Sequence, residues 1–311
     1  MTCCRVKHVS GDIDDTMVML PTRRESYVLQ DVCGKGSYAT VFVSHVTTDT
    51  LGTLSVAVKV IDLEHVADLQ HVADEAQVMR YMRHPSLLGL FVSFVFGSSL
   101  WMVMPRMKYG SLRKIIDKKY PDGIHSMRIV ATLTRPIIDA LAYMHENNYI
   151  HRDVKASNIM VDETGSVRLG DFGISTRVNM MIDPESNSET NTPHRTFAGS
   201  PPWMAPEVIE QYYGYDTSAD IWSFGITLLE IAQGKAPVEH IRNPIRAIMS
   251  IMSDDPPSPT SQSFTHSFND LCKQCLRKNP RLRPTAEEVQ NHRFWKIVQP
   301  KEYILKHMSL D

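Results

Sequence analysis

The sequence predicts an α+β protein of two lobes, in which a β-rich first part precedes a helical second part. The chain has 311 residues, and domains of about 150 residues leave room for two lobes. Its content of 42% hydrophobic and 22% charged residues is typical of a folded globular protein. Strand patterns occupy the first part: Tyr27–Leu29, Ala39–Val46 and Leu54–Ile61.

The rest of the first part reads as one helix followed by a hairpin. We expect a helix over His65–Met82, and then two β-type runs, Phe91–Phe96 and Leu100–Met104, separated by the turn residues Gly97–Ser99. The surrounding stretch, residues 87–105, carries no charge up to Pro105 and is long enough to raise the question of a membrane span. The turn in its middle favours a buried hairpin instead, so no membrane span is expected.

The second part is mostly helical. An apolar stripe with helical spacing predicts a core-facing helix, and Pro136 inside it should kink the helix or cost about 3 kcal/mol. Ile221–Ile231 is apolar nearly all round, which is typical of a helix buried on every side. Residues 177–195 are polar and aperiodic, and we expect a long, mobile loop there. The apolar stripe of the helix that contains Pro136 consists of Val130, Leu133, Ile137, Leu141 and Met144.

Charge and cysteine content limit the partners and the compartment. The formal net charge is −2, from 33 basic and 35 acidic side chains, which gives no reason to expect nucleic acid as a partner. Five cysteines and no apolar signal-peptide core favour a reducing, cytoplasmic location, with the nucleus also open. Cys272 and Cys275 have the spacing of zinc ligands, but a helix with two buried thiols is the better interpretation.

A glycine-containing segment lies between the first two strand patterns. Its glycines would let backbone N–H groups approach a phosphate without a Cβ in the way. On this motif alone, a plain hairpin turn is the favoured alternative. Ala39 stands where a third glycine would complete G-x-G-x-x-G. The segment reads Gly34, Lys35, Gly36, Ser37, Tyr38, Ala39.

A lysine and a glutamate could form a buried pair in the first part. Lys59 ends the apolar run Val56–Lys59, and Glu75 shares a helix face with Val72, Met79 and Met82. A carboxylate on an apolar face is costly unless it is paired, and Lys59 is the obvious partner. Such a pair would hold the ammonium toward a phosphate. The alternatives are a solvated lysine and an unrelated glutamate at a helix edge.

The strongest chemical signal is the segment Ile150–Ile159, followed by Asp171 in Leu169–Gly173. Phosphoryl transfer from ATP needs a carboxylate that orients the hydroxyl nucleophile, cations that neutralise phosphate oxygens, and oxygen ligands for Mg²⁺. Asp153 can supply the first, Lys155 together with Lys59 the second, and Asn158 with Asp171 the third. The sequence therefore predicts an ATP- and Mg²⁺-dependent phosphotransferase.

In their order, these motifs resemble those of eukaryotic protein kinases over about residues 27–295. More narrowly, the chain is similar to the germinal-centre branch of sterile-20-like kinases, nearest the SPAK/Fray group, on the strings Leu100–Met104, Thr196–Met204 and Gly214–Asp216. The family motifs are the glycine loop, Val56–Lys59, Glu75, His151–Asp153, Asp171–Gly173, Ala205–Glu207, Asp220–Gly225 and Arg283.

The resemblance implies a bilobal protein kinase fold with a small β-rich N-lobe and a larger helical C-lobe. It implies an N-terminal extension over 1–26, an N-lobe over about 27–104, a hinge over about 105–110, a C-lobe over about 111–295 and a tail over 296–311. It also implies that Glu207 and Arg283 pair, and that Asp220 binds the backbone near His151–Asp153. Nucleotide contacts are implied for Cys33, Gly34, Lys35, Gly36, Ser37, Val41, Ala57, Lys59, Met104 as gatekeeper, and Met107.

The resemblance further implies transfer to Ser or Thr hydroxyls of protein substrates, because Lys155 follows the catalytic Asp153. Ser200 stands where Thr is usual, and its hydroxyl can serve the same purpose by reaching Asp153. Thr196 is the expected activating phosphorylation site, paired with Arg152 and modified in trans or by an upstream kinase, with Thr192 as the second candidate. The alternative function is a pseudokinase-like scaffold, but Lys59, Asp153, Asn158 and Asp171 are all present.

Overall fold

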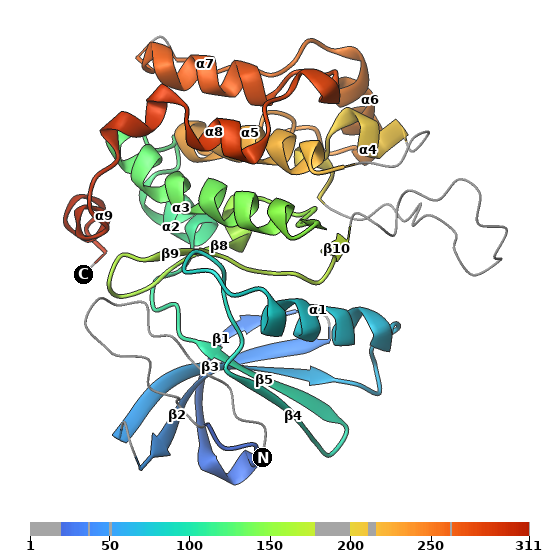
Figure 1. Ribbon diagram of the computed structural model, residues 1–311, viewed down its shortest axis with the longest axis vertical. Helices are drawn as coiled ribbons and strands as arrows, with labels where there is room; N and C mark the ends of the chain where they lie inside the picture. Colours follow the sequence, from blue (N-terminus) through green and yellow to red (C-terminus); the bar gives the residue numbers. More distant parts are fainter. Residues whose placement is uncertain are drawn as a thin grey trace, which may run out of the picture. The chain divides into compact units, whose positions relative to one another are not determined.

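The computed structural model describes residues 20–36, 38–49, 52–177, 200–210, 216–261 and 263–310. It divides into two compact units, with the boundary between Lys108 and Tyr109 (Figure 1). The first unit is a β-sheet with one helix and the second is mainly helical, which confirms the predicted α+β class. The segment predicted as a long loop, 177–195, lies outside the described residues apart from its first position.

The first unit contains a five-stranded antiparallel sheet in the order β1-β2-β3-β5-β4. The three strands and the hairpin predicted from the sequence are confirmed. Each of β1, β2 and β3 is longer than the range predicted for it. Gly97, with φ of 57°, lies in the tight turn between β4 and β5. The elements are a 3₁₀ turn at Arg24–Ser26, β1 (Tyr27–Lys35), β2 (Ala39–Thr48), β3 (Gly52–Asp62), α1 (Leu69–Tyr81), β4 (Val92–Phe96) and β5 (Ser99–Pro105).

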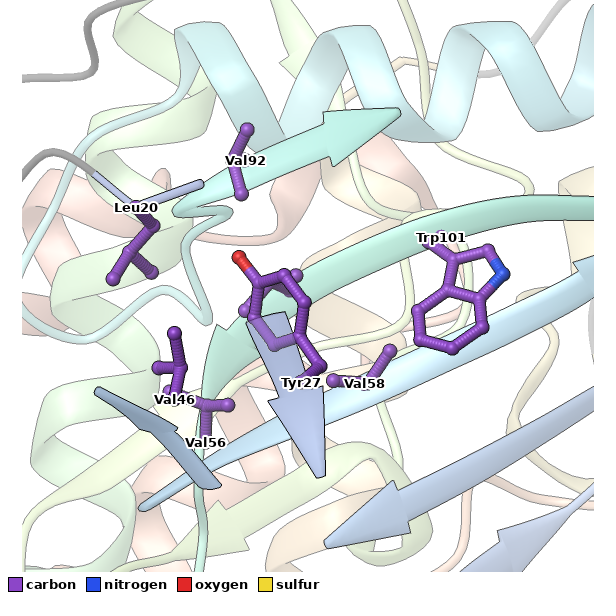
Figure 2. Close-up of a cluster of buried hydrophobic side chains, with 8 residues drawn as sticks. Leu20, Tyr27, Val46, Val56, Val58, Val92 and Trp101 are labelled. Carbon is purple, nitrogen blue, oxygen red and sulfur yellow. The ribbon is translucent and has the colours of Figure 1, made fainter. Parts of the chain in front are cut away.

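One face of this sheet carries an apolar cluster (Figure 2). Alternation along β3 sends Val56 and Val58 to this face. There Val103 on β5 lies opposite Val58, and Val46 on β2 lies opposite Leu54, which is partly buried against the cluster. Leu20 covers part of the cluster, and the Tyr27 hydroxyl donates to the Pro21 carbonyl at 2.6 Å. Leu20 and Pro21, expected to belong to an extension, therefore contact the sheet. The buried members are Leu20, Tyr27, Val46, Val56, Val58, Val92, Trp101 and Val103.

Helix α1 begins later than the sequence predicted. The expected start was His65, but the helix begins at Leu69 because the Asp68 carboxylate accepts the backbone N–H groups of Gln70 and His71. Residues 62–65 instead form a turn in which Asp62 accepts from the His65 ring at 2.8 Å. The prediction of the first turn is thus wrong, and the capping aspartate explains why.

The second unit packs its helices around a long central pair. Helix α3 contacts α5 and α8, and α5 also contacts α7 (Figure 1). The helices are α2 (Leu112–Lys119), α3 (Met127–Glu146), α4 (Pro206–Glu210), α5 (Ser218–Gln233), α6 (Pro244–Ser253), α7 (His266–Cys275), α8 (Ala286–Gln290) and α9 (Glu302–Met308). Short strands complete it: β6 (Gly110–Ser111), β7 (Tyr149–Ile150), β8 (Ile159–Val161), β9 (Val167–Leu169) and β10 (Thr176–Arg177).

The two helices singled out in the sequence are both present. Helix α3 buries the predicted stripe and runs through Pro136 without ending. Residues 219–232 of α5 are all buried, as expected for a helix enclosed on every side. Cys272 and Cys275 are both fully buried in α7, which confirms the interpretation as a helix with two buried thiols.

The segment expected as a C-terminal tail is docked on the second unit. Ile304 and Met308 of α9 are buried, and the Lys301 ammonium donates to the hydroxyls of Thr164 and Ser166 at 3.3 Å each. Gly165 between those hydroxyls has φ of +82°, and a Cβ there would lie 2.4 Å from the Lys301 carbonyl oxygen. Only glycine fits that turn. None of the helices within the described ranges has the length and apolar character needed to cross a membrane.

Candidate active site

The residues expected to contact nucleotide in the first unit share one face of the sheet. Cross-strand register places Gly34 opposite Val41, and Val41 opposite Lys59. Ala57 lies two residues before Lys59 and opposite Met104, so it faces the same way. This face is the opposite one from the apolar cluster of Figure 2. The structure thus gathers Val41, Ala57, Lys59 and Met104 on one surface.

The glycine segment is the hairpin turn between β1 and β2. Lys35 pairs with Thr40, and the Gly36 N–H donates to the Ala39 carbonyl at 2.8 Å. Ser37 lies outside the described residues. Cys33 is exposed, and its thiol donates to the Val41 carbonyl at 3.4 Å. The alternative interpretation, a hairpin turn, therefore describes the local backbone correctly. A hairpin turn can still bind phosphate, so this finding does not exclude that role.

Lys59 and Glu75 form an ion pair inside the first unit. The ammonium lies 2.6 Å from Oε1 and 2.9 Å from Oε2 of Glu75. The glutamate side chain is only 9% exposed and the lysine side chain 22%, so the contact is largely shielded from water. Met104 and Met107, the two candidate nucleotide contacts near the end of β5, are both buried. The sequence predicted this pairing from the cost of burying an isolated carboxylate.

In the second unit, the Asp153 carboxylate is held by three side chains. The Lys155 ammonium lies 2.6 Å from Oδ2, and the Asn158 amide nitrogen donates to the same oxygen at 2.9 Å. The Ser200 hydroxyl donates to Oδ1 at 3.0 Å and accepts from Lys155 at 2.5 Å. Every side chain that the sequence assigned around Asp153 is therefore within hydrogen-bond reach of it, including the serine in place of threonine.

Buried groups fix the backbone that precedes Asp153. Asp220 on α5 accepts from the N–H groups of His151 and Arg152 at 2.8 Å each, and from the His145 ring at 2.8 Å. Arg152 has φ of 69°, an uncommon conformation for a side-chain-bearing residue, and these bonds hold it. Burial raises the pKa of Asp220, but the hydrogen bonds and charges of its partners outweigh burial and leave it lowered. Asp220 is therefore an anion inside the unit.

His151 supports Asp153 as a neutral ring. Burial lowers the pKa of His151 below its usual value, although nearby carboxylates act in the opposite direction. Its Nδ1 accepts from the Asp153 N–H at 3.3 Å, and its Nε2 contacts the Gly170 carbonyl at 3.1 Å. The ring also packs edge-on to Phe172 at 5.4 Å between centroids. His151 thereby links the segment of Asp153 to that of Asp171.

Asn158 and Asp171 are brought together by the β8–β9 pair. Ile159 pairs with Leu169, and the Gly170 N–H donates to the Asn158 carbonyl at 2.9 Å. The Asn158 amide nitrogen is committed to Asp153, which leaves its Oδ1 with only a 3.4 Å bond from Ser157. Asp171 is exposed, with φ of 64°. One amide oxygen and one carboxylate fit Mg²⁺, which takes few protein ligands and keeps several waters.

Sequence reasoning missed a set of polar groups on α5. Ser223, Thr227 and Glu230 are buried and hydrogen-bonded to the segments around Asp153 and Ser200. Their 4-3 spacing, which continues the face of Asp220, was the available signal. The predicted pair of Arg283 and Glu207 is present, with 2.8 Å between Nη2 and Oε2. Thr192 and Thr196 lie outside the described residues.

A family model described as "Protein kinase domain" matches residues 27–295. The chain belongs to that family. It is 36% identical over 293 residues to serine/threonine-protein kinase fray2 of Dictyostelium discoideum, covering 93% of this chain and 27% of fray2. It is 33% identical over 302 residues to germinal center kinase 3 of Caenorhabditis elegans, covering 92% of this chain and 50% of that protein.

A third relative is covered more fully. Serine/threonine-protein kinase ppk11 of Schizosaccharomyces pombe is 35% identical over 268 residues, which is 86% of this chain and 80% of ppk11. The chain thus spans about a quarter to a half of the first two relatives and most of the third. The names Fray and germinal center kinase among the relatives confirm the predicted branch of sterile-20-like kinases.

Proposed function

We propose that this protein is an active serine/threonine protein kinase of sterile-20-like type, which transfers the γ-phosphoryl group of ATP to protein hydroxyls with Mg²⁺. The observation that carries the proposal is the Asp153 carboxylate, oriented at once by Lys155, Asn158 and Ser200. A scaffold that had lost catalysis would have no need for this arrangement. The relatives' names and the family match support the same conclusion.

Each residue has a role in this reaction. Asp153 accepts a hydrogen bond from the substrate hydroxyl, aims its oxygen at the γ-phosphorus and takes its proton. Lys155, 2.6 Å from that carboxylate, places a positive charge where negative charge develops. Asn158 and Asp171 would hold Mg²⁺, which neutralises phosphate oxygens when bound. Glu75 orients the Lys59 ammonium, whose charge is suited to the nucleotide phosphates.

The test is Asp153→Asn, which keeps the size of the side chain and removes its charge. We expect transfer to a generic basic protein substrate to fall by orders of magnitude, while the thermal shift caused by ATP and Mg²⁺ persists. Unchanged turnover in Asp153→Asn would contradict the role of Asp153. If the wild-type chain binds nucleotide and shows no turnover in any phosphorylation state, it is the scaffold alternative that holds.

We also propose activation by phosphorylation at Thr196, with Arg152 among the groups that bind the phosphate. Arg152 is fixed beside Asp153 by Asp220, and a phosphate adds nearly two negative charges that a guanidinium can bind. Unphosphorylated protein should have low activity and gain it on modification. The kinase activities of Thr196→Ala, Thr192→Ala and wild type are compared after phosphorylation, and mass spectrometry measures how fully each site carries phosphate. Full activation of Thr196→Ala would reject this site.

Partners and location follow from the same proposal. Protein substrates with Ser or Thr acceptors and an upstream activating kinase are the expected partners, and nucleic acid is not, because the net charge is −2. We propose a reducing, cytoplasmic location, supported by the sparse cysteines, with the nucleus as the alternative. Imaging of the tagged full chain tests the location, and a positional peptide array tests substrate preference.

A further inference from the structure

A stretch with three prolines follows helix α6 and leads toward α7 (Figure 1). Residues 255–261 form no helix or strand, and Ser258 near their centre is exposed. Ser258 stands between Pro257 and Pro259. A proline has a fixed φ and favours an extended conformation for the residue before it, so these prolines keep the chain extended around Ser258. Residues 254–260 are called the proline segment below.

Hydrogen bonds hold the proline segment at both ends. At its start, the Asp254 N–H donates to the Ser250 carbonyl at 3.0 Å, which closes the last turn of α6. At its end, Thr260 donates to the side-chain oxygen of Gln233 on α5, from its N–H at 2.8 Å and from its hydroxyl at 2.7 Å. Residues 255–259 therefore lie between two fixed points, and the folded protein itself presents Ser258 on an extended backbone.

Ser258 differs from its neighbours in the state of its hydroxyl. Across residues 250–261 and 263–265, which the structure describes, it is the one side-chain hydroxyl that makes no hydrogen bond. A free, exposed hydroxyl on an extended backbone is what a modifying enzyme needs in its acceptor. The other hydroxyls are bound to the chain: Ser250 to the Asp254 carboxylate, Ser253 to the Met249 carbonyl, Thr260 to Gln233, Ser261 to Ser263, and Thr265 to the Phe268 N–H.

The sequence contains three hydroxyl residues that are followed by proline: Thr192, Ser200 and Ser258. Thr192 lies outside the described residues. Ser200 also has an extended backbone, with φ of −95° and ψ of 116°. Its hydroxyl, however, donates to Asp153 at 3.0 Å and accepts from Lys155 at 2.5 Å. The two described Ser-Pro sites therefore share their sequence and their extended backbone, and they differ in whether the hydroxyl is free.

We propose that Ser258 is the acceptor site of a separate, proline-directed serine kinase, which phosphorylates this chain in its folded state. Ser258 Oγ attacks the γ-phosphorus of the ATP that this enzyme holds. The new O–P bond forms, the bond from the γ-phosphorus to the β–γ bridging oxygen breaks, and ADP leaves. The hydroxyl proton passes to the catalytic carboxylate of the modifying enzyme. The phosphoserine adds nearly two negative charges to a segment that already contains Asp254 and Asp255.

Pro259 determines which class of kinase fits this site. In a groove that binds an extended peptide, an ordinary residue after the acceptor buries an N–H group, which must find a hydrogen-bond partner. Proline has no N–H group, so an enzyme without an acceptor at that position binds Ser-Pro and rejects other sequences. Modification of Ser258 by this chain's own active site is the competing idea. The inference does not depend on the kinase activity proposed above.

The test uses the folded full chain with Asp153→Asn, a change that removes transfer by the chain itself. This variant is incubated with ATP, Mg²⁺ and a purified proline-directed serine/threonine kinase, and mass spectrometry follows the phosphate at each position over time. Synthetic peptides of residues 195–205 and 253–263 give the rate of the same enzyme on each Ser-Pro sequence without the fold. The ratio of the two rates, folded chain to peptide, is the quantity compared between Ser258 and Ser200.

We expect Ser258 in the folded chain to be modified within about threefold of the rate of its peptide, because its hydroxyl needs no local opening. Ser200 should be modified at least about 20-fold more slowly than its own peptide, because its hydroxyl must first leave Asp153 and Lys155. Slowing of Ser258 to the same degree as Ser200 would overturn the proposal. So would phosphorylation of Ser258 in the wild-type chain with ATP and Mg²⁺ alone, at the rate that the added kinase gives.

Two alanine variants test the part played by Pro259. Pro257→Ala and Pro259→Ala each remove a half-buried ring beside Ser258, but only the second restores an N–H group after the acceptor. We expect the rate at Ser258 to fall at least about 10-fold in Pro259→Ala, and to stay within about threefold of the parent in Pro257→Ala. Equal rates in the two variants would reject the proline-directed class. If either variant fails to fold, peptides of residues 253–263 with the same changes decide the comparison.

Discussion

Arg283 uses every N–H group of its guanidinium, and replacing it by methionine should destabilise the second unit strongly. The side chain is 0% exposed. It pairs with both carboxylate oxygens of Glu207, donates to backbone carbonyls, and lies over the Trp222 ring at 5.0 Å. The carbonyls are those of Arg277 at 2.7 Å, Ser218 at 3.0 Å and Lys278 at 3.2 Å. Five donors and five acceptors are therefore matched.

Arg283→Met leaves the Glu207 carboxylate and three carbonyls without their partner in a site with little water. Removing one member of a buried ion pair costs about 3–5 kcal/mol. For a unit of the size of residues 109–311, about 2–4 °C of Tm is lost per kcal/mol, which gives a decrease of about 6–20 °C. Differential scanning calorimetry of the full chain, with the transitions of the two units resolved, measures this loss.

Arg293→Met is the control, because it removes the same charge from an exposed site. Arg293 is 52% exposed and pairs with Asp270 at 3.0 Å. An exposed pair contributes less than about 1 kcal/mol, so the variant should lower Tm by only a few degrees. Equal losses in Arg283→Met and Arg293→Met would refute the reasoning, since burial and matched donors would then have contributed nothing.

Two further predictions concern the first unit and the thiols. Glu75→Gln should lower kcat about 10-fold or more with a small change in Tm, because Lys59 loses the charge that orients it; a large drop in Tm with normal specific activity would show a structural role instead. A thiol reagent at pH 8 should label exposed Cys33 well before Cys272 and Cys275, because burial raises the pKa of Cys275 to about 12 and that of Cys272 well above its usual value. Peptide mapping checks this, and early labelling in α7 would contradict the burial.

Strands and motifs could be predicted from the sequence because their signals are local. Alternation predicted β2 and β3, and Gly97 marked the β4–β5 turn. The start of α1 could not be predicted from apolar spacing, because the pattern continues back to His65 while the capping carboxylate of Asp68 determines the first turn. A search for N-cap residues would have corrected it.

The pairing of side chains was predictable only where one choice was physically compelling. Lys59 was the one cation proposed for Glu75, because a buried carboxylate demands a partner. The four-residue contact around Asp153 joins positions 153–158 to position 200, and only the family resemblance suggested that Ser200 belongs there. Residue patterns alone could not predict this contact, because its members lie far apart in the sequence.

One buried helix, α5, organises both segments of the site through four buried polar side chains: Asp220, Ser223, Thr227 and Glu230. Asp220 lies near the start of α5, where the helix dipole favours an anion, and its partners keep its pKa lowered despite burial. Glu230 lies near the end of the helix, where the dipole opposes an anion. There burial raises its pKa, and the bonds from Ala156, Trp203 and Arg113 reduce that effect without cancelling it. Asp220, whose pKa is lowered, therefore fixes the left-handed turn at Arg152. Glu230 joins the two segments by accepting from the N–H groups of Ala156 and Trp203. Both donors are neutral, and Glu230 can accept their bonds in either protonation state.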